Sequence, residues 1–386
     1  MNLLICAVAA VLLGAAIALF VNPSGPPPAA SATLSLRDVL NADGADGFAR
    51  VEAPAALEFP RDHGPHPRHR VEWWYFTGNV ESGAGRRFAY QLTFFRRARS
   101  AVQEASTSSW ATNQMYMAHF ALTDVEAERH VGFEKLSRGA AGLAGSAGAP
   151  FRVWVDDWSA RTTGNALFPI RLQASDGAVE IGLHLTAEKP LVLHGEDGFS
   201  SKTRDALTAS YYYSWTRLNT AGALSVGGTD YEVTGSSWMD HEWSTSVLDA
   251  RHQGWDWFSV QLDDGTEFMC FRMRHVAGPA ASFVTGTYVS ADGESRSMSA
   301  AEIELSAGEP LSAVARGPGY PSSWRISLPH ERLELRLTPL VADQEMDLSF
   351  RYWEGAVRAR GSRAGEEVTG YGYVELTGYQ AATTAP

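Results

Sequence analysis

Apolar side chains recur at every second position along most of this chain. The clearest run alternates large apolar residues with small or polar ones, and it consists of Phe88, Tyr90, Leu92 and Phe94. Because successive side chains of a β-strand point to opposite faces, a period of two predicts a strand with one buried face. Strong patterns with the helical period of 3.6 are nearly absent after Val71. The sequence therefore predicts an all-β protein.

Strands of this kind are expected along the whole chain, separated by turn-forming segments such as ESGAG, LDDGTEF and SADGES. The ESGAG turn predicts that 74–80 and 88–95 form a hairpin. The remaining expected strands are 115–123, 151–155, 170–174, 179–186, 211–218, 231–238, 257–262, 267–273, 283–289, 324–328, 333–337 and 370–379.

Two segments share one plan and indicate a molecule made of two halves. WWYFTGNVESGAGRRFAYQLTFFRR and WDWFSVQLDDGTEFMCFRMR each have an aromatic opening, a strand, a Gly turn, a second strand and closing Arg residues. We expect an N-terminal barrel over 58–222 and a C-terminal barrel over 223–386, with the boundary in the small-residue segment 220–228. Each half has the size of an eight-stranded barrel that can hold one ligand.

The N-terminus is expected to direct export. Residues 3–21 are almost uninterruptedly apolar, close to the roughly 20 residues that span a bilayer, so 1–32 is interpreted as a signal peptide or membrane anchor with a Pro/Ala-rich spacer. A linker with a candidate short helix follows at 33–57. We expect a periplasmic or extracellular protein, free or tethered by this segment, with no other membrane contact.

The net charge argues against a nucleic-acid partner, and the cysteine content excludes a disulfide within the mature domain. The formal net charge of −12 argues against a nucleic-acid partner. The only cysteines are Cys6, in the leader, and Cys270, which is expected to be a buried small residue. No disulfide can therefore hold the mature domain together.

The segment 235–258 concentrates the side chains that could carry chemistry. Indole rings are interleaved there with groups that transfer protons, as in the wall of a small-molecule pocket. The candidate catalytic residues are Asp240, His241, Glu242 and Asp256, and the candidate ligand-binding residues beside them are Trp238, Trp243, Trp255 and Trp257.

These residue types are the ones that acid-catalysed addition of water to an alkene requires. It needs an acid that protonates carbon, a wall that tolerates the resulting cation, and a water held nearby. A carboxyl group buried among indoles keeps its proton because burial raises its pKa, and the faces of the Trp rings stabilise a cation. His241 could position or activate the water.

Strand alternation limits which of these residues can face one site. If 238–243 is one regular strand, Asp240 and Glu242 face one way and His241 and Trp243 the other. We favour His241 and Trp243 inside the barrel, with Asp240 at a strand end or orienting the His241 ring. The alternative is that Asp240 and His241 form a buried hydrogen-bonded network that bridges the two barrels.

Other candidates for ligand binding lie elsewhere in the chain. They are Tyr211 and Tyr213, Arg217 as the partner of a buried carboxylate, Trp74, which is more typical of a barrel core, and Glu354 beside Trp353. His63, His66 and His69 are three apart in RDHGPHPRHR, but the Pro residues exclude a helix, and a solvated loop is favoured over a metal site. No residue set requires a metal or cofactor, and HEWST and AGSAG do not complete a zinc or serine hydrolase motif.

One set of motifs extends over nearly the whole chain: VEWWYFTGNV, YMAHFALTD, EDGFSSK, YYYSWTRL, SWMDHEWS, GWDWF, YWEGAV and GYGYVELTGY. From about Glu58 to Tyr379 the chain resembles the AttH-like secreted proteins, which are related to the carotenoid 1,2-hydratases (hydroxyneurosporene synthases). The resemblance implies two lipocalin-like antiparallel barrels side by side. The family's Asp-His-x-Trp element falls on Asp240, His241 and Trp243, and its Trp-Asp-Trp element on 255–257.

The resemblance implies several activities. Relatives add water to isoprenoid double bonds, others shape the cyclisation of natural products, and AttH-like proteins are linked with a transporter system. Arg272 and Arg274 stand where carotenoid hydratases are acidic, which argues against carotenoids as substrates. The expected partner is an apolar small molecule or lipid, bound by a hydratase- or cyclase-type enzyme, by a lipid carrier beside an ABC-type transporter, or by a secreted hydrolase, the label that many AttH-like proteins carry.

Overall fold

The computed structural model describes residues 46–379 except 165, 247 and 312–318. The leader, the spacer and most of the linker with its candidate helix lie outside these residues. In the described part, the only helical elements are the short 3-10 turns η1 (Arg61–His63), η2 (Pro279–Ala281), η3 (Ala300–Glu302) and η4 (Pro329–Glu331). None of its helices has the length and hydropathy needed to cross a membrane. The all-β prediction is confirmed.

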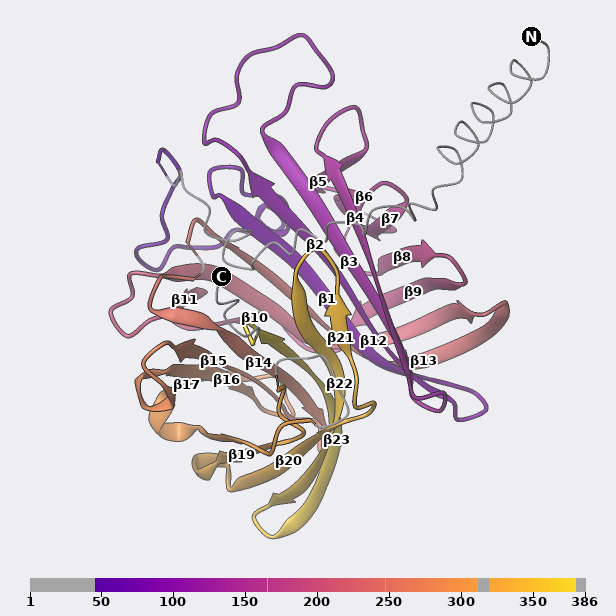
Figure 1. Ribbon diagram of the computed structural model, residues 1–386, viewed down its shortest axis with the longest axis vertical. Coiled ribbons are helices and arrows are strands. Elements are labelled where there is room, and N and C mark those ends of the chain that lie inside the picture. Colours follow the sequence, from indigo (N-terminus) through magenta and orange to yellow (C-terminus); the bar gives the residue numbers. More distant parts are fainter. Residues whose placement is uncertain (1–45, 165, 247, 312–318, 380–386) are drawn as a thin grey trace, which may run out of the picture. The chain divides into compact units, whose positions relative to one another are not determined.

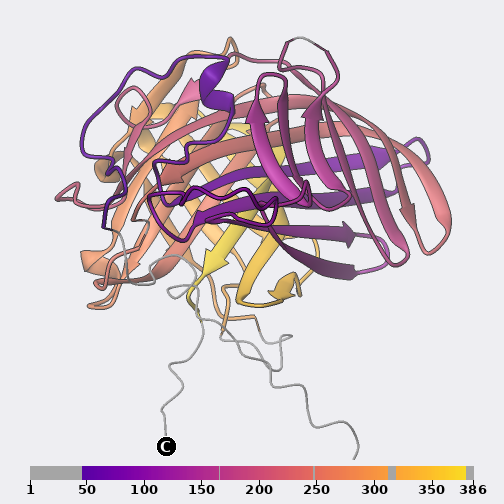
Figure 2. The same ribbon diagram turned by 90° about the horizontal axis from the view of Figure 1, so that it is seen from above.

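The first sheet has 13 strands, all paired antiparallel, in the order β4-β3-β2-β1-β13-β12-β9-β8-β7-β6-β5, with β10 and β11 paired to β12. Figures 1 and 2 show it curling, in indigo through salmon. Its strands are β1 (Val71–Ser82), β2 (Arg87–Ala98), β3 (Gln114–Asp124), β4 (Arg129–Arg138), β5 (Ala144–Gly148), β6 (Phe151–Val155), β7 (Trp158–Thr162), β8 (Ile170–Asp176), β9 (Val179–Ala187), β10 (Val192–Leu193), β11 (Phe199–Ser201), β12 (Ala209–Val226) and β13 (Thr229–Ser244).

The second sheet has 10 strands in the order β17-β16-β15-β14-β23-β22-β20-β19-β18, with β21 paired to β22. It is drawn in orange to yellow in Figure 1. Its strands are β14 (His252–Leu262), β15 (Glu267–His275), β16 (Phe283–Val289), β17 (Ser295–Met298), β18 (Glu304–Ala307), β19 (Trp324–Leu328), β20 (Leu333–Pro339), β21 (Glu345–Asp347), β22 (Arg351–Arg363) and β23 (Glu366–Thr377).

Each sheet curls around its own apolar core, as expected for a lipocalin-like barrel. The even-numbered residues of β2, from Phe88 to Phe94, are fully buried in the first core together with Trp74 and Trp158. The second core is built around Phe258, Trp324 and other apolar residues of the C-terminal strands. The alternation in the sequence predicts these inward faces correctly, and the hairpins at ESGAG, LDDGTEF and SADGES form as expected.

The predicted boundary between the two halves needs correction, and the structure has strands that were not predicted. The segment 220–228 is not a boundary between the halves, because it lies at the β12–β13 hairpin inside the first sheet. The chain passes to the second sheet between Ser244 and His252. The AGSAG segment is itself strand β5, and β4 and β22 are strands that the sequence analysis did not assign.

A buried carboxylate joins the two sheets. Glu267 of β15 has no exposed side-chain area, and its Oε2 lies 2.7 Å from the Lys189 ammonium, in the loop after β9. Its Oε1 accepts a hydrogen bond from the Arg217 guanidinium of β12. Arg217 is therefore the partner of a buried carboxylate, as expected for a cation placed among aromatic side chains.

Replacing Glu267 with Gln should destabilise the fold by about 3 kcal/mol, because two cations would lose their buried counter-charge. The free energy of unfolding, measured by urea denaturation, checks this. Glu180→Gln, at an exposed position of β9, serves as the control and should change stability by less than about 0.5 kcal/mol. Equal stability of the two variants would show that the Glu267 contacts do not hold the sheets together.

Candidate active site between the sheets

An apolar cavity of about 350 Å³ lies between the two sheets. Strands β1, β2, β3, β4, β12 and β13 line it from the first sheet, and β14, β15, β22 and β23 line it from the second. The sequence analysis places ligands inside the barrels, but the barrel interiors hold the two packed cores. The candidate site is therefore at the junction of the barrels.

Strand β13 separates the candidate residues of 238–243 into two sets. Asp240 and Glu242 line the cavity, whereas Trp243 lies in the core of the first barrel and His241 is stacked on Trp74 of that core, with ring centroids 4.8 Å apart. The expected alternation therefore holds. Two expectations for Asp240 are wrong, since it lies within the strand rather than at its end and it does not contact the His241 ring. The alternative network that joins Asp240 to His241 is excluded for the same reason.

Asp240 is a buried acid with neutral partners. Its Oδ1 accepts a hydrogen bond of 2.6 Å from the Trp238 indole and another from the Ser214 hydroxyl. Burial raises the pKa of Asp240 to about 7, although these hydrogen bonds oppose the shift. At neutral pH a large share of this carboxyl group holds a proton that it can donate.

Glu354 and Glu375 form a second acidic pair in the cavity wall. They lie directly opposite each other on β22 and β23; Glu354 is buried, and Glu375 is partly buried. Burial and the nearby Glu375 raise the pKa of Glu354 well above its usual range, although the Tyr75 hydroxyl donates to Glu354 at 2.9 Å. Burial likewise raises the pKa of Glu375 to about 7. Two carboxyl groups so close cannot both ionise easily.

Glu242 differs from these three acids because its carboxylate forms an ion pair with a lysine. The Lys202 ammonium lies 2.6 Å from Glu242 Oε1, and Ser210 donates a hydrogen bond to the same oxygen. Lys202 also lies over the Phe271 ring, 4.4 Å from its centroid. The pair is a buried salt bridge in the cavity wall, and Glu242 is a poor candidate for the proton donor.

Asp256 does not reach the cavity. Its neighbours Trp255 and Trp257 line the cavity, and Asp256 points to the opposite face of β14. There it contacts Arg272 at 2.5 Å and Arg274 at 3.0 Å. The arginines that distinguish this chain from carotenoid hydratases thus neutralise Asp256, and the expectation that Asp256 shares a site with Asp240 is wrong.

Aromatic side chains form most of the remaining wall. Trp255, Trp257, Tyr75 and Tyr212 line the cavity. The Trp257 indole donates to the Tyr212 hydroxyl at 3.1 Å, and the Trp257 ring lies edge-on to Tyr75 at 5.3 Å. The wall is therefore apolar with fixed polar groups, which suits a small organic molecule.

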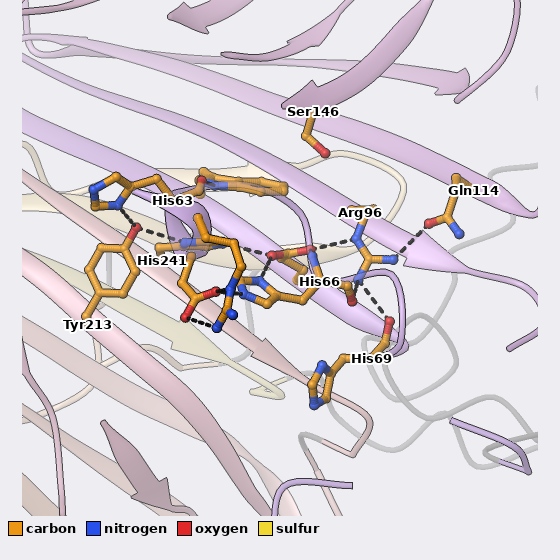
Figure 3. A network of polar contacts seen from close by, with 12 residues as sticks. His63, His66, His69, Arg96, Gln114, Ser146, Tyr213 and His241 are labelled. Carbon is orange, nitrogen blue, oxygen red and sulfur yellow. Dashed lines mark hydrogen bonds and ion pairs between the residues drawn. The ribbon is translucent and has the colours of Figure 1, made fainter. Parts of the chain in front are cut away.

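A hydrogen-bonded network connects His63, His66 and His241 with Arg96 (Figure 3), and its Glu72 and Arg96 also line the cavity. The carboxylate of Glu72 accepts from His241 Nε2 at 2.9 Å, from His66 Nδ1 at 2.7 Å and from Arg96 Nε at 2.7 Å. These contacts hold the pKa of Glu72 well below its usual range despite its burial. Burial lowers the pKa of His241 to about 4, so its ring is neutral at pH 7.

Tyr213 extends this network to the segment before β1. Its hydroxyl lies 3.0 Å from His241 Nδ1 and 2.9 Å from His63 Nδ1. His66 stacks on Trp243 with ring centroids 3.7 Å apart. The prediction of a solvated loop at 61–70 is wrong, because His63 is buried and this segment packs into the open end of the barrel.

Three ligand atoms in this network could hold a metal ion. One atom each of His66, Glu72 and His241 lies within 4.8 Å of the other two. The Arg96 cation already balances the charge of Glu72, and the imidazole groups already donate to the same carboxylate. Hydrogen bonding therefore accounts for this cluster without an ion. Of the three spaced histidines, only His66 belongs to it.

The other candidates lie outside the cavity wall. Trp74 is a core residue that donates to the His63 carbonyl oxygen at 3.1 Å. Tyr211 donates to the Ala53 carbonyl oxygen at 3.1 Å. Glu354, in contrast, lies at the centre of the wall.

Sequence reasoning missed most of the cavity wall, including Glu375, Tyr75, Tyr212 and Lys202. The sequence around Glu375 could have identified it, because a carboxyl group between the apolar residues Val374 and Leu376 of one strand is unusual. The position of Lys202, in a segment just after β11, depends on tertiary contacts that no local pattern reveals.

Replacing Asp240 with Asn should change the dependence of stability on pH. In the wild type the folded-state pKa is raised, so the contribution of Asp240 is most favourable below its unfolded pKa and is lost as pH rises towards about 7. The stability of Asp240→Asn relative to wild type should therefore rise by about 1.4 kcal/mol per pH unit across pH 5 to 7 and level off above. Urea denaturation at several pH values measures this difference.

Asp230→Asn, at an exposed position on the same strand, is the matched control and should track wild type at each pH. A difference between Asp240→Asn and wild type that stays constant with pH would contradict the raised pKa of Asp240.

Comparison with known proteins places the chain in a family. The family model described as AttH-like matches residues 50–379, and no curated protein matches. A crystal structure of a candidate AttH from Nitrosomonas europaea is 34% identical, with a TM-score of 0.75, and the match covers 86% of this chain and all of that one. Kievitone hydratase from Nectria haematococca (14% identity, TM-score 0.64, 86% and 95% covered) and CghA crystallised with Sch210972 (15%, 0.53, 88% and 98%) share the fold. The chain belongs to the AttH-like family.

Proposed function

We propose that this protein is an acid–base enzyme of the hydratase or cyclase type, acting on an apolar unsaturated molecule in the cavity between the sheets. The observation that carries the proposal is a set of three carboxyl groups, the buried Asp240 and Glu354 and the partly buried Glu375, which line an aromatic cavity with their pKa values raised. Glu72 and Glu242, which also line the cavity, have cations beside them instead.

The chemistry requires a proton donor, a cation-tolerant wall and a base. A protonated carboxyl group, Asp240 or one of the Glu354–Glu375 pair, gives its proton to one alkene carbon, and the other carbon becomes cationic. The faces of Trp255 and Trp257 stabilise that cation. Water then adds to it and returns a proton to the carboxylate, so the enzyme ends in its starting state. If an internal double bond attacks the cation instead, a ring forms, and the new cation then loses a proton to the carboxylate or takes up water.

One structural neighbour favours this reaction class. Kievitone hydratase is named for a hydration, and it has the same fold. In this chain Asp256 is neutralised by Arg272 and Arg274 outside the cavity, so we place the acid on Asp240 and the glutamate pair rather than on the Trp-Asp-Trp element. This assignment supports an unsaturated substrate other than a carotenoid.

Isotope incorporation tests the proposal. Purified protein is incubated with a panel of isoprenoid and prenylated alkenes, kievitone included, in water enriched in deuterium and oxygen-18, and products are analysed by mass spectrometry. We expect a hydrated product with one deuterium on carbon and one labelled hydroxyl. Asp240→Asn and Glu375→Gln should each lower its rate at least about 100-fold, the usual size of a general-acid contribution.

Glu180→Gln, outside the cavity, is the control and should retain the wild-type rate. Absence of hydrated or cyclised product across the panel, together with a lipid that is retained through purification and released unchanged, would favour a carrier working beside a transporter. The lipid-carrier function is the main alternative, because an apolar cavity wall would also suit a lipid that is bound without reaction.

We also propose that the apolar run at 3–21 directs export, as its length and composition favour. Cell fractionation of the full chain and of a chain lacking residues 1–32 should place the first outside the cytoplasm and retain the second inside. Retention of both inside would contradict export.

A further inference from the structure

A row of buried hydrogen bonds connects Asp240 with the second sheet. Ser214 of β12 lies directly opposite Asp240 of β13, and its hydroxyl donates to Asp240 Oδ1. In the segment after β10, the His194 ring lies with Nε2 2.6 Å from the Ser214 hydroxyl and with Nδ1 2.8 Å from the hydroxyl of Thr287 on β16. All four side chains are buried. Ser214, His194 and Thr287, here called the His194 bridge, lie outside the cavity wall.

The direction of these hydrogen bonds follows from the groups around Asp240. The Trp238 indole N–H can only donate, and it does so to Asp240 Oδ1 at 2.6 Å. Ser214 donates to the same oxygen, so its own oxygen is left to accept from His194 Nε2. A neutral imidazole with its proton on Nε2 has an unprotonated Nδ1, which accepts from the Thr287 hydroxyl. Each donor of the His194 bridge is therefore directed towards Asp240.

His194 stays neutral over the pH range in which Asp240 titrates. Burial and the Lys202 cation lower the pKa of His194 to about 3, whereas burial raises the pKa of Asp240 to about 7. Between these values the imidazole keeps one N–H and one unprotonated nitrogen, so the His194 bridge keeps one direction. The remaining titratable groups that act on Asp240 are Tyr212, Glu242 and Glu375.

We infer that His194 is a positioning residue for the proton donor: through Ser214 it keeps Oδ1 of Asp240 as a hydrogen-bond acceptor, so that the transferable proton is held on Oδ2. This inference rests on the proposed function in taking Asp240 as the acid. When Oδ2 gives its proton to an alkene carbon, the negative charge is shared with Oδ1, where two donors are already in place. The proton lost by the added water returns to Oδ2, and the His194 bridge gains and loses none.

The fixed donors make Asp240 a stronger acid than burial alone would leave it. Hydrogen bonds from Ser214 and Trp238 to the ionised form lower the pKa of Asp240 and so oppose the effect of burial. His194 strengthens the first of these bonds, because an N–H that donates to the Ser214 oxygen polarises the hydroxyl and stops it from rotating away. Asp240 thus holds a proton near neutral pH and still releases it to carbon readily.

The titration of Asp240, measured without substrate, tests the inference. The full-length protein is labelled with aspartate that carries carbon-13 in its side-chain carboxyl group, and the Asp240 resonance is assigned by its loss in Asp240→Asn. His194→Phe retains a ring beside Tyr212, whose centroid lies 4.1 Å from that of His194, but has no nitrogen that can donate to Ser214. We expect this variant to raise the titration midpoint of Asp240 by about 0.5 to 1 pH unit, the size of one weakened hydrogen bond.

The two hydroxyl groups of the His194 bridge give a graded series. Ser214→Ala removes the donor to Asp240 and should raise the midpoint at least as far as His194→Phe. Thr287→Val removes only the donor to His194 Nδ1, which selects the tautomer of the ring, so it should raise the midpoint by a smaller amount. This smaller change also tests the inference if His194→Phe does not fold.

Two further variants separate positioning from a structural role. His194→Gln supplies an amide N–H for Ser214 and should restore the wild-type midpoint. His119→Phe is the matched control, because His119 of β3 is also a buried histidine that joins the sheets, with Nδ1 2.6 Å from the Tyr352 hydroxyl of β22. It should lower stability without moving the Asp240 midpoint.

An Asp240 midpoint that keeps its wild-type value in His194→Phe and Thr287→Val, or that moves equally in His119→Phe, would overturn the inference. Where hydrated product forms, His194→Phe should also lower kcat by up to about 10-fold with KM unchanged, because the acid is weaker and the cavity wall is intact. A midpoint that shifts as expected in a protein that hydrates no alkene would contradict the proposed function alone.

Discussion

The position of the candidate site depends on strand β13, whose two faces contact different parts of the molecule. Its odd residues, Met239, His241 and Trp243, face the interior of the first barrel, and its even residues, Asp240 and Glu242, face the second sheet. A shift of register by one residue would exchange these two sets. The strand is paired along its length with β1 and β12, so this exchange is prevented and the acids are held at the junction between the sheets.

Counter-cations divide the buried carboxyl groups into two classes. Glu72 has Arg96, Glu242 has Lys202, and Glu267 has Lys189 with Arg217. In these sites a cation balances the carboxylate charge, although burial still raises the pKa of Glu267 against the effect of its two cations. Asp240, Glu354 and Glu375 have hydroxyl or indole partners instead, so burial dominates and their pKa values rise. The contacts that make this distinction join distant strands, and Asp240, Glu354 and Glu375 all line one cavity.

Local patterns predict the fold better than the site. Alternation identifies the hairpin of β1 and β2 and both faces of β13, because each depends only on a period of two. The histidines at 63–69 were misassigned because proline excludes a helix but does not exclude a segment packed through Glu72 and Trp243. Local patterns do not identify Glu375, and they wrongly indicate a catalytic role for Asp256, because the partner of each acid lies on a neighbouring strand. Glu375 lies opposite Glu354 of β22, and Asp256 pairs with Arg272 of β15.

The junction between the sheets makes the site a property of the whole chain. Each barrel has its own apolar core. The cavity depends on both sheets, since Asp240 and Tyr75 come from one sheet and Glu354, Glu375 and Trp257 from the other. The Tyr75–Glu354 and Trp257–Tyr212 hydrogen bonds cross the junction within the cavity wall itself. Contacts that stabilise the docking of the sheets, Glu267 among them, therefore also determine how closely the acids and the aromatic wall can surround one substrate.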